Sequence, residues 1–174
     1  VLKTPRLPFD KFTTASRTLG TQMKATGEVM AIGRTFEESF GKAMRSLEDG
    51  HVGLLSSGRD DLSALADEEI EQGAATPTEH RIFYVAEALR RGWTTERVHG
   101  ITGIDPWFID RIADMMAARE QIRGLRVEDI DADSMRLLKQ YGTSDAEIAM
   151  LTGSDERFVR AYRKGQGVVP SMKT

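Results

Sequence analysis

The sequence predicts a mainly α-helical fold, a multi-helix domain with an internal three-helix repeat, preceded by a short α/β segment. Beyond residue 50, nearly every stretch has apolar residues at helical spacing, opens on a polar capping residue and closes on glycine. Residues 1–48 hold the strand-like sequence, with eight basic and five acidic side chains against 16 and 22 in the remainder. We therefore divide the chain into 1–50, the last strands and helix of an α/β domain, and 51–174, a helical domain.

The composition bounds the classes of function. A chain of 174 residues is long enough for one domain with its own core, and a net charge of −3 argues against binding nucleic acid or membranes over the whole surface. We accordingly expect no nucleic-acid partner and no membrane partner. The absence of cysteine excludes disulfides and thiolate chemistry and fits the cytoplasmic location that we predict. Because the chain opens on Val1 rather than Met, we expect a piece of a longer protein.

Within 1–50 the strand-like sequence surrounds Gly27. Residues 21–26 and 28–32 predict two short extended segments joined by a glycine turn. Pro5 and Pro8 make the opening extended but unsuited to a central strand. The segment therefore contains only a small part of a sheet.

The helix that follows has a specific start signal. Thr35 and Glu38 form a capping box, in which the hydroxyl accepts an early backbone amide and the carboxylate reaches back to the cap, and Gly50 closes the helix. The apolar residues of this helix form a stripe. We expect the centre of the stripe to pack on the sheet and distinguish it from the edge. The centre comprises Phe36, Ala43 and Leu47, and the edge comprises Phe40 and Met44.

Residues 51–174 predict a linker followed by helices. The stretch from Gly53 to Gly58 is rich in glycine and serine, which is typical of a linker. Asp105 as a cap and Pro106 in the first turn give one helix an especially clear start. The predicted helices span 61–72, 78–91, 95–101, 106–123, 132–141, 145–151 and 155–164.

An internal repeat recurs at an offset of 50 residues, which predicts two equivalent helical units at about 78–112 and 128–162. Each unit reads as a helix, a glycine, a short helix, Thr-Gly, an acidic cap and a helix with an aromatic residue in its first turn. We expect the units to superpose, with Phe108 and Phe158 equivalent and buried. The matching positions are Gly92/Gly142, Val98/Ile148, Ile101/Leu151, Thr102/Thr152, Gly103/Gly153, Asp105/Asp155, Phe108/Phe158 and Ile109/Val159.

The candidate chemical sites all have simpler readings. Asp129, Asp131 and Asp133 begin like a calcium loop, but Ser134 and Gln140 stand where such a loop needs glycine and glutamate. Three histidines lack paired ligand spacing, and we expect each on the surface: His51, His80 and His99. The carboxylate run at 68–71 fits a solvated helix face, and the glycines near residue 30 are too sparse for a phosphate loop. We predict no catalytic, cofactor-binding or metal-binding residue.

One alternative function remains open, a helix-turn-helix module that binds nucleic acid. Residues 144–163 run through a short helix, a Thr-Gly turn and a second helix that carries Arg157, Arg160, Arg163 and Lys164. Against this reading, residues 94–112 have the same pattern with acidic residues on the corresponding helix, so the pattern is better explained by architecture.

Longer motifs resemble a known family. Residues 3–12 read KTPRLPFDKF, residues 20–35 read GTQMKATGEVMAIGRT, and Arg81–Tyr84 and Ile104–Phe108 add shorter matches. Together these stretches resemble the large subunit of carbamoyl phosphate synthetase, at the join between its first ATP-grasp half and its helical oligomerisation domain. The resemblance covers essentially the whole chain.

The resemblance implies a parent ligase that makes carbamoyl phosphate from glutamine-derived ammonia, bicarbonate and two ATP, for pyrimidine and arginine synthesis. The family's ATP- and Mg²⁺-binding motifs fall outside these residues, so no catalytic position is carried over, and we expect this piece alone to be non-catalytic. The implied partners are other large subunits, the flanking synthetase domains and the small glutamine-amidotransferase subunit.

A self-association surface is the one site that we predict. Phe40 and Met44, at the edge of the helix stripe, are candidates for a self-complementary apolar patch on a two-fold axis. The alternative is that Phe40 simply belongs to the core.

Overall fold

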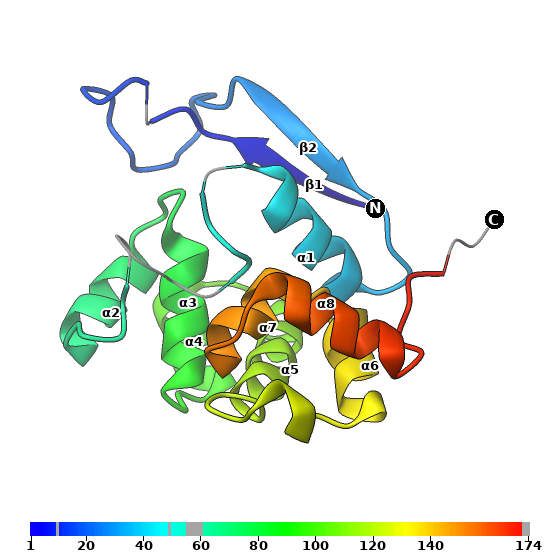
Figure 1. The fold of residues 1–174 in the computed structure, drawn as a ribbon. Coiled ribbons are helices and arrows are strands. Elements are labelled where there is room, and N and C mark those ends of the chain that lie inside the picture. The colour runs from blue at the N-terminus through cyan, green and yellow to red at the C-terminus, as the bar shows by residue number, and fades with distance from the viewer. Residues whose placement is uncertain (10, 49, 55–60, 172–174) are drawn as a thin grey trace.

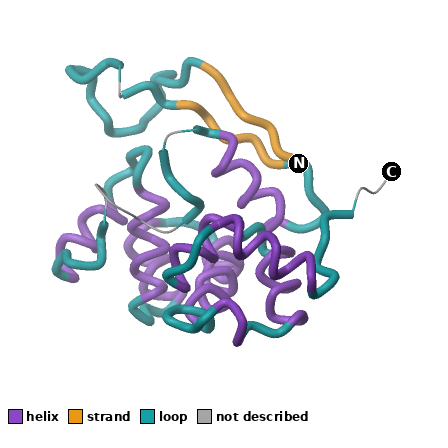
Figure 2. Tube along the Cα trace, viewed as in Figure 1, coloured by secondary structure: helices purple, strands orange, loops and turns teal. Residues whose placement is uncertain are grey.

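The computed structural model describes residues 1–9, 11–48, 50–54 and 61–171 of the protein (Figure 1). A two-stranded sheet lies along one edge, helix α1 (Phe36–Ser46) lies against it, and the other helices pack on the far side of α1. Figure 2 shows the same division, with both strands and the long loop between them at one margin and the helices gathered on the other side. The described part is therefore mainly helical, as the sequence predicts.

The sheet pairs different segments from those expected. Strand β1 (Leu2–Arg6) runs antiparallel to β2 (Gly27–Ala31), with Leu2 opposite Ala31 and Arg6 opposite Gly27. The prediction of a strand over 21–26 was wrong, because those residues belong to the long connection between the strands. Pro5 is accommodated because each strand of a two-stranded sheet has a free edge, where the missing N–H leaves no bond unmade.

Helix α1 begins where the capping signal places it. The hydroxyl of Thr35 accepts a hydrogen bond from the amide of Glu38 at 3.2 Å, and the Glu38 carboxylate accepts one from the amide of Arg34 at 2.9 Å. The helix ends at Ser46, and two residues with positive φ, Glu48 and Gly50, turn the chain beyond it. The cap thus fixes both the start of α1 and the direction in which its first turn faces.

The remaining helices follow the predicted order. Their boundaries agree within a few residues except at α2, which begins six residues later than expected because residues 61–66 form a turn. The linker predicted at 53–58 lies largely outside the described residues. The helices are α2 (Asp67–Ala75), α3 (Arg81–Arg90), α4 (Thr95–Thr102), α5 (Pro106–Glu120), the 3₁₀ turn η2 (Val127–Asp129), α6 (Ala132–Gln140), α7 (Asp145–Thr152) and α8 (Glu156–Gly165).

The elements recur at the 50-residue offset. Helices α4 and α7 have the same relative bounds, and α5 and α8 start 50 residues apart. Gly103 and Gly153 end α4 and α7 in the left-handed conformation, at φ 69° and 66°, which glycine adopts without steric cost. The hydroxyls of Thr102 and Thr152 each donate to the carbonyl four residues earlier at 2.8 Å. The superposition of the two units and the division of the chain at residue 50 stay predictions.

The prediction that Phe108 and Phe158 are buried was wrong. They are 44% and 43% exposed, whereas Ile109 and Val159, the next residues in each helix, are fully buried. Successive residues of an α-helix point about 100° apart. Phe108 and Phe158 each precede the first buried residue of their helix, Ile109 or Val159. Each phenylalanine therefore lies at the edge of the buried face of its helix.

Candidate self-association surface

Four aromatic rings gather where the first turns of α1 and α5 meet, and we call them the aromatic patch: Phe36, Phe40, Trp107 and Phe108. The ring of Phe36 stacks on Phe40 at 5.2 Å between centroids and meets Trp107 and Phe108 edge-on at 5.5 and 5.6 Å. Trp107 and Phe108 are themselves perpendicular at 5.0 Å. Trp107 is 52% exposed and Phe36 and Phe40 are half-buried, so the patch is an apolar surface with a packed base.

Local sequence explains why these rings converge. Phe36 and Phe40 lie one turn apart on α1, so they share a face. On α5, Asp105 caps the helix by accepting from the amide of Trp107 at 2.9 Å, and Pro106 occupies the first turn. These caps hold both first turns in one conformation and aim the rings at each other.

The structure separates the two residues predicted for the interface. Met44 is 4% exposed and lies in the main hydrophobic core, so it offers no surface to a partner. Its position follows from the packing of α1, which contacts α5 as well as both strands. The ring of Phe36, which was expected on the sheet, contacts α5 through Trp107 and Phe108, while Ala43 is fully buried apart from the main core. The interface role of Phe40 stays a prediction.

A close backbone contact positions α1 on the second helical unit. A Cβ on Gly41 would stand 2.8 Å from the carbonyl oxygen of Gly142 and 2.9 Å from its Cα. The guanidinium of Arg45 donates to the same carbonyl oxygen, and burial lowers the pKa of Arg45. Helix α1 is therefore seated on the turn between α6 and α7, which fixes where its first turn lies.

Charged groups at the margin of the aromatic patch carry both signs. The Arg111 guanidinium lies 3.7 Å from the carboxylate of Glu37 and 3.0 Å from that of Asp114. Arg111 and Asp114 are half-exposed, whereas Glu37 is buried. The patch therefore has an apolar centre and a charged margin.

One ion pair lies wholly inside the domain. The Nε of Arg119 donates to Oε1 of Glu147 at 3.2 Å, and these side chains are 1% and 0% exposed. The other carboxylate oxygen of Glu147 accepts from the amide of Ser144 at 2.9 Å, completing a capping box at the start of α7. This pair ties α5 to α7 and leaves no charge facing solvent.

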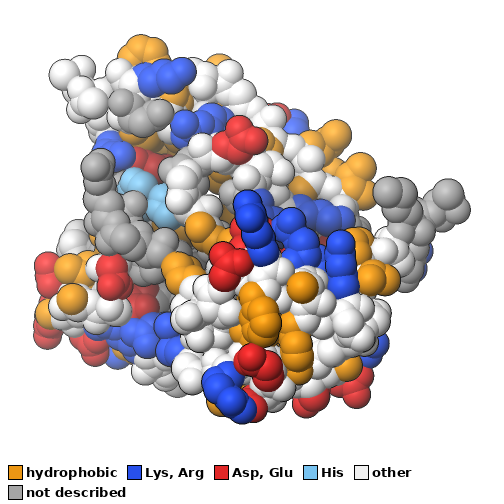
Figure 3. All heavy atoms as spheres, in the orientation of Figure 1, with side chains coloured by type: hydrophobic (Ala, Val, Ile, Leu, Met, Phe, Trp, Pro, Cys, Tyr) orange, Lys and Arg blue, Asp and Glu red, His pale blue; other side chains and the backbone are white. Residues whose placement is uncertain are grey.

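The basic residues of α8 are partly engaged within the domain. Arg163 is buried and contacts both oxygens of Asp145 at 2.8 and 2.9 Å, and Arg160 and Lys139 contact Asp145 at 3.2 and 2.8 Å. Burial alone would raise the pKa of Asp145, but hydrogen bonds from these three cations outweigh it and hold that pKa well below its usual range. Figure 3 shows basic side chains gathered on the face where α8 lies.

Two histidines lie closer together than their sequence spacing suggests. The rings of His51 and His80 are 5.9 Å apart, and His51 stacks on Phe83 at 4.1 Å. Glu79 lies 3.3 Å from His80 and 2.6 Å from Arg17, which belongs to the connection between the strands. Among the described residues, no group of three or more histidine or acidic side chains could hold a metal ion.

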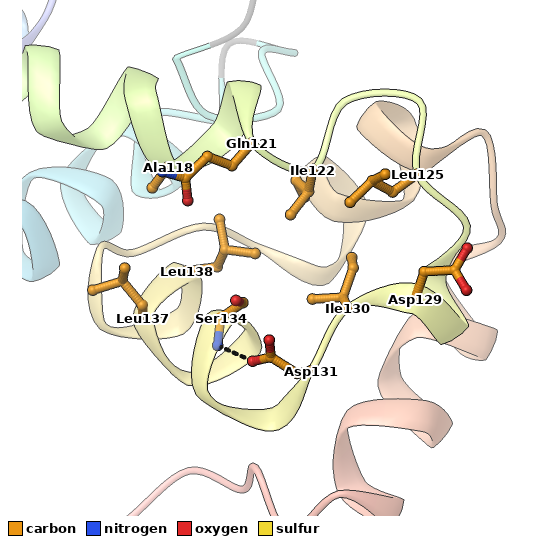
Figure 4. A pocket seen from close by; sticks show the side chains of 10 residues that line it. All are labelled: Ala118, Gln121, Ile122, Leu125, Asp129, Ile130, Asp131, Ser134, Leu137 and Leu138. Atoms are coloured by element: carbon orange, nitrogen blue, oxygen red, sulfur yellow. Dashed lines mark hydrogen bonds between the residues drawn. The ribbon is translucent and has the colours of Figure 1, made fainter.

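A small pocket of about 170 Å³ lies between the end of α5, η2 and α6 (Figure 4). Its walls are part aliphatic, with Ile122, Ile130 and Leu138, and part polar, with Gln121 and Ser134. The nearby aspartates of the calcium-like run serve local structure: Asp131 caps α6 through the amide of Ser134, and Asp129 and Asp133 pair with arginines three residues away. The pocket therefore presents no group poised for chemistry.

The comparisons identify the family. Residues 28–167 match the family described as carbamoyl-phosphate synthetase large chain, oligomerisation domain. The chain belongs to this family. The matched range includes β2 except Gly27 and every helix in the described part of the chain, so the aromatic patch lies entirely within the oligomerisation domain.

Curated relatives match along almost the whole chain. The carbamoyl phosphate synthase large chains of Archaeoglobus fulgidus and of a Synechocystis species are each 42% identical, over 97% and 99% of this chain. That of Xanthomonas axonopodis pv. citri is 43% identical over 99% of it. The chain spans 16% of the length of each of these relatives. None of the helices in the described ranges is long and apolar enough to cross a membrane.

Sequence reasoning missed three members of the aromatic patch of this oligomerisation domain. It placed Phe36 on the sheet, buried Phe108 and overlooked Trp107. A usable signal was the repeat itself, because Trp107 occupies the position that Arg157 takes in the second unit. Arginine is found mostly at exposed positions, so Arg157 at the matching position favours an exposed side chain at residue 107.

Proposed function

We propose that this domain is the oligomerisation segment of a carbamoyl phosphate synthase large chain, where it joins copies of the chain and spaces the flanking synthetase domains. The observation that carries the proposal is the match to the oligomerisation-domain family over residues 28–167. The buried charges support a structural role, because Arg119, Glu147 and Asp145 are all consumed in contacts inside the domain.

The activity proposed for the whole protein follows from the names of the relatives. It is the ligation that makes carbamoyl phosphate from glutamine-derived ammonia, bicarbonate and two ATP, for pyrimidine and arginine synthesis. We place ATP and Mg²⁺ in ATP-grasp regions outside these residues, and add the small glutamine-amidotransferase subunit as a partner. A cytoplasmic location completes the proposal, in keeping with a chain that has no cysteine.

Self-association is tested by sedimentation velocity on the complete large chain over a hundredfold range of concentration. We expect the sedimentation coefficient to rise with concentration, and to stop rising when residues 28–167 are replaced by a flexible linker of equal span. An unchanged concentration dependence after the replacement would show that the copies join elsewhere.

The non-catalytic role is tested with the 174-residue chain alone. We expect titration calorimetry with Mg-ATP to give no saturable heat, because phosphate binding needs a glycine-rich amide cradle or a Lys/Arg clamp on the phosphates. Binding tighter than about 100 μM, near −5.5 kcal/mol, would contradict this assignment.

A further inference from the structure

We propose that the aromatic patch of α1 and α5 is the contact through which a second copy of this chain docks, patch against patch around a two-fold axis. This inference rests on the proposed self-association and names the surface that performs it. Trp107 and Phe108 are the anchors, and Phe36 and Phe40 form the base on which they rest.

The rings of the aromatic patch already pack against one another within a single copy of the chain. Trp107 contacts Phe36 and Phe108 at 5.5 and 5.0 Å, and the caps at Thr35 and Asp105 fix the helices that carry them. Association costs entropy for every side chain that it immobilises, so rings already held in place reduce that cost. Tryptophan is also among the residues that most often dominate the free energy of protein interfaces.

The internal repeat provides a comparison within one molecule. Phe158 has the same helical position and nearly the same exposure as Phe108, but its described ring contact is a single stack on Tyr162 at 6.4 Å. Arg157 stands where the first unit has Trp107. The two backbones are capped alike, so the fold itself does not require a large exposed ring at residue 107.

The charged margin suits a second copy of the same surface. A two-fold contact brings each surface against its own image, so a margin with one sign of charge would repel itself. Here Arg111 and Asp114 are both half-exposed and stand next to each other on α5. Arg111 of each copy can therefore face Asp114 of the other copy, so that opposite charges meet across the contact.

The size of the patch suits the centre of an interface. A covered aromatic side chain buries about 150–250 Å², so the exposed halves of Trp107 and Phe108 offer about 200 Å². A stable interface buries about 800 Å² on each partner. The aromatic rings thus form the dry centre, and the surrounding surfaces of α1 and α5 form the polar rim that such interfaces have.

The test uses two substitutions at residue 107 in the complete large chain, measured by sedimentation velocity. We expect Trp107→Ala to weaken association about 30-fold, which corresponds to about 2 kcal/mol. We expect Trp107→Arg to abolish association, because it places two like charges across the axis. Arginine is a residue that the fold already accepts at the equivalent position 157, so this variant should keep its melting temperature.

The matched control is Phe158→Ala, which removes an equally exposed ring from the equivalent helix of the second unit. We expect it to change association less than threefold. If the complete chain associates and both Trp107 variants associate equally well, the patch is not the contact, although the domain still joins copies by another surface. If the unaltered chain stays monomeric at every concentration, the proposed function fails and this inference fails with it. Equal losses from Phe158→Ala and Trp107→Ala would also overturn the assignment.

Discussion

The substitution Gly41→Ala tests how α1 is seated on the helical domain. Gly41 lies inside α1 and its φ is not positive, so alanine suits the local backbone. Alanine is the better helix former by about 0.5–1 kcal/mol, and considered alone this substitution should stabilise the helix. The structure predicts the opposite outcome.

The cost comes from the turn between α6 and α7. The added Cβ would stand 2.8 Å from the carbonyl oxygen of Gly142, 2.9 Å from its Cα and 3.1 Å from its carbonyl carbon. These are backbone atoms, which cannot rotate away as a side chain can, so either α1 or the turn must shift. Overpacking of this kind costs about 1–3 kcal/mol. Set against the helical gain of about 0.5–1 kcal/mol, the net fall in the free energy of unfolding spans about 0–2.5 kcal/mol, and we expect a value near the middle, about 1–2 kcal/mol.

Thermal unfolding followed by circular dichroism measures the effect. For a chain of this size we expect the melting temperature of Gly41→Ala to fall by roughly 2–8 °C. Gly100→Ala in α4 is the matched control, because a Cβ there meets no atom within 4 Å. That control should gain about 0.5–1 kcal/mol and melt roughly 1–4 °C higher. The reasoning is refuted if Gly41→Ala is as stable as the parent chain while Gly100→Ala behaves as expected.

Two further predictions concern the buried charges. Glu147→Gln keeps the shape of the side chain but leaves the buried guanidinium of Arg119 unpaired, so urea unfolding should show a loss of about 3–5 kcal/mol, and a loss below 1 kcal/mol would contradict the burial of this pair. Asp145→Asn should change how stability depends on pH. The folded pKa of Asp145 lies below its unfolded value near 3.9, so its contribution is complete above about pH 5 and is lost as the pH falls. The parent chain should therefore lose stability between pH 5 and pH 2 more steeply than the variant, as measured by urea midpoints, and parallel pH profiles would exclude this role.

Most of the helical architecture could be predicted because its signals are local. Caps such as Asp105 and Ser144 and stops such as Gly103 and Gly153 act within one turn, so the sequence alone locates the helix ends. The start of α2 was misplaced because Leu62 has helical spacing with the residues after it but is buried in a turn. The spacing of apolar residues shows which side chains are buried, whether or not they belong to a helix. A turn that packs on the core can therefore have apolar residues at helical spacing.

The sheet and the candidate surface depended on contacts between distant residues. The partner of β2 lies more than 20 residues earlier in the chain, and an antiparallel pair can form across a loop of any length, so the nearer segment was chosen wrongly. The stripe of α1 likewise did not reveal which edge would meet the sheet. Met44 is buried in the main hydrophobic core that the later helices form, and the sequence of α1 alone does not show which of its residues those helices cover.

The repeat shows where local sequence stops determining structure. Arg97 and Glu147 occupy equivalent positions three residues after equivalent caps, Thr94 and Ser144. The guanidinium of Arg97 lies on the surface, 3.4 Å above the ring of Trp93, whereas Glu147 is completely buried.

The difference comes from what covers each turn. A Cβ on Gly53 would stand 2.0 Å from the Glu147 carboxylate, so the chain after α1 lies directly over it, and Gly41 of α1 rests on the preceding turn at Gly142. The caps start α4 and α7 at equivalent positions, and among the described residues Gly53 lies over the buried side chain of Glu147 in α7. Helix α1 therefore contacts both units: Gly41 rests on Gly142 of the second unit, and the first turn of α1 lies beside the exposed rings of Trp107 and Phe108 in the first.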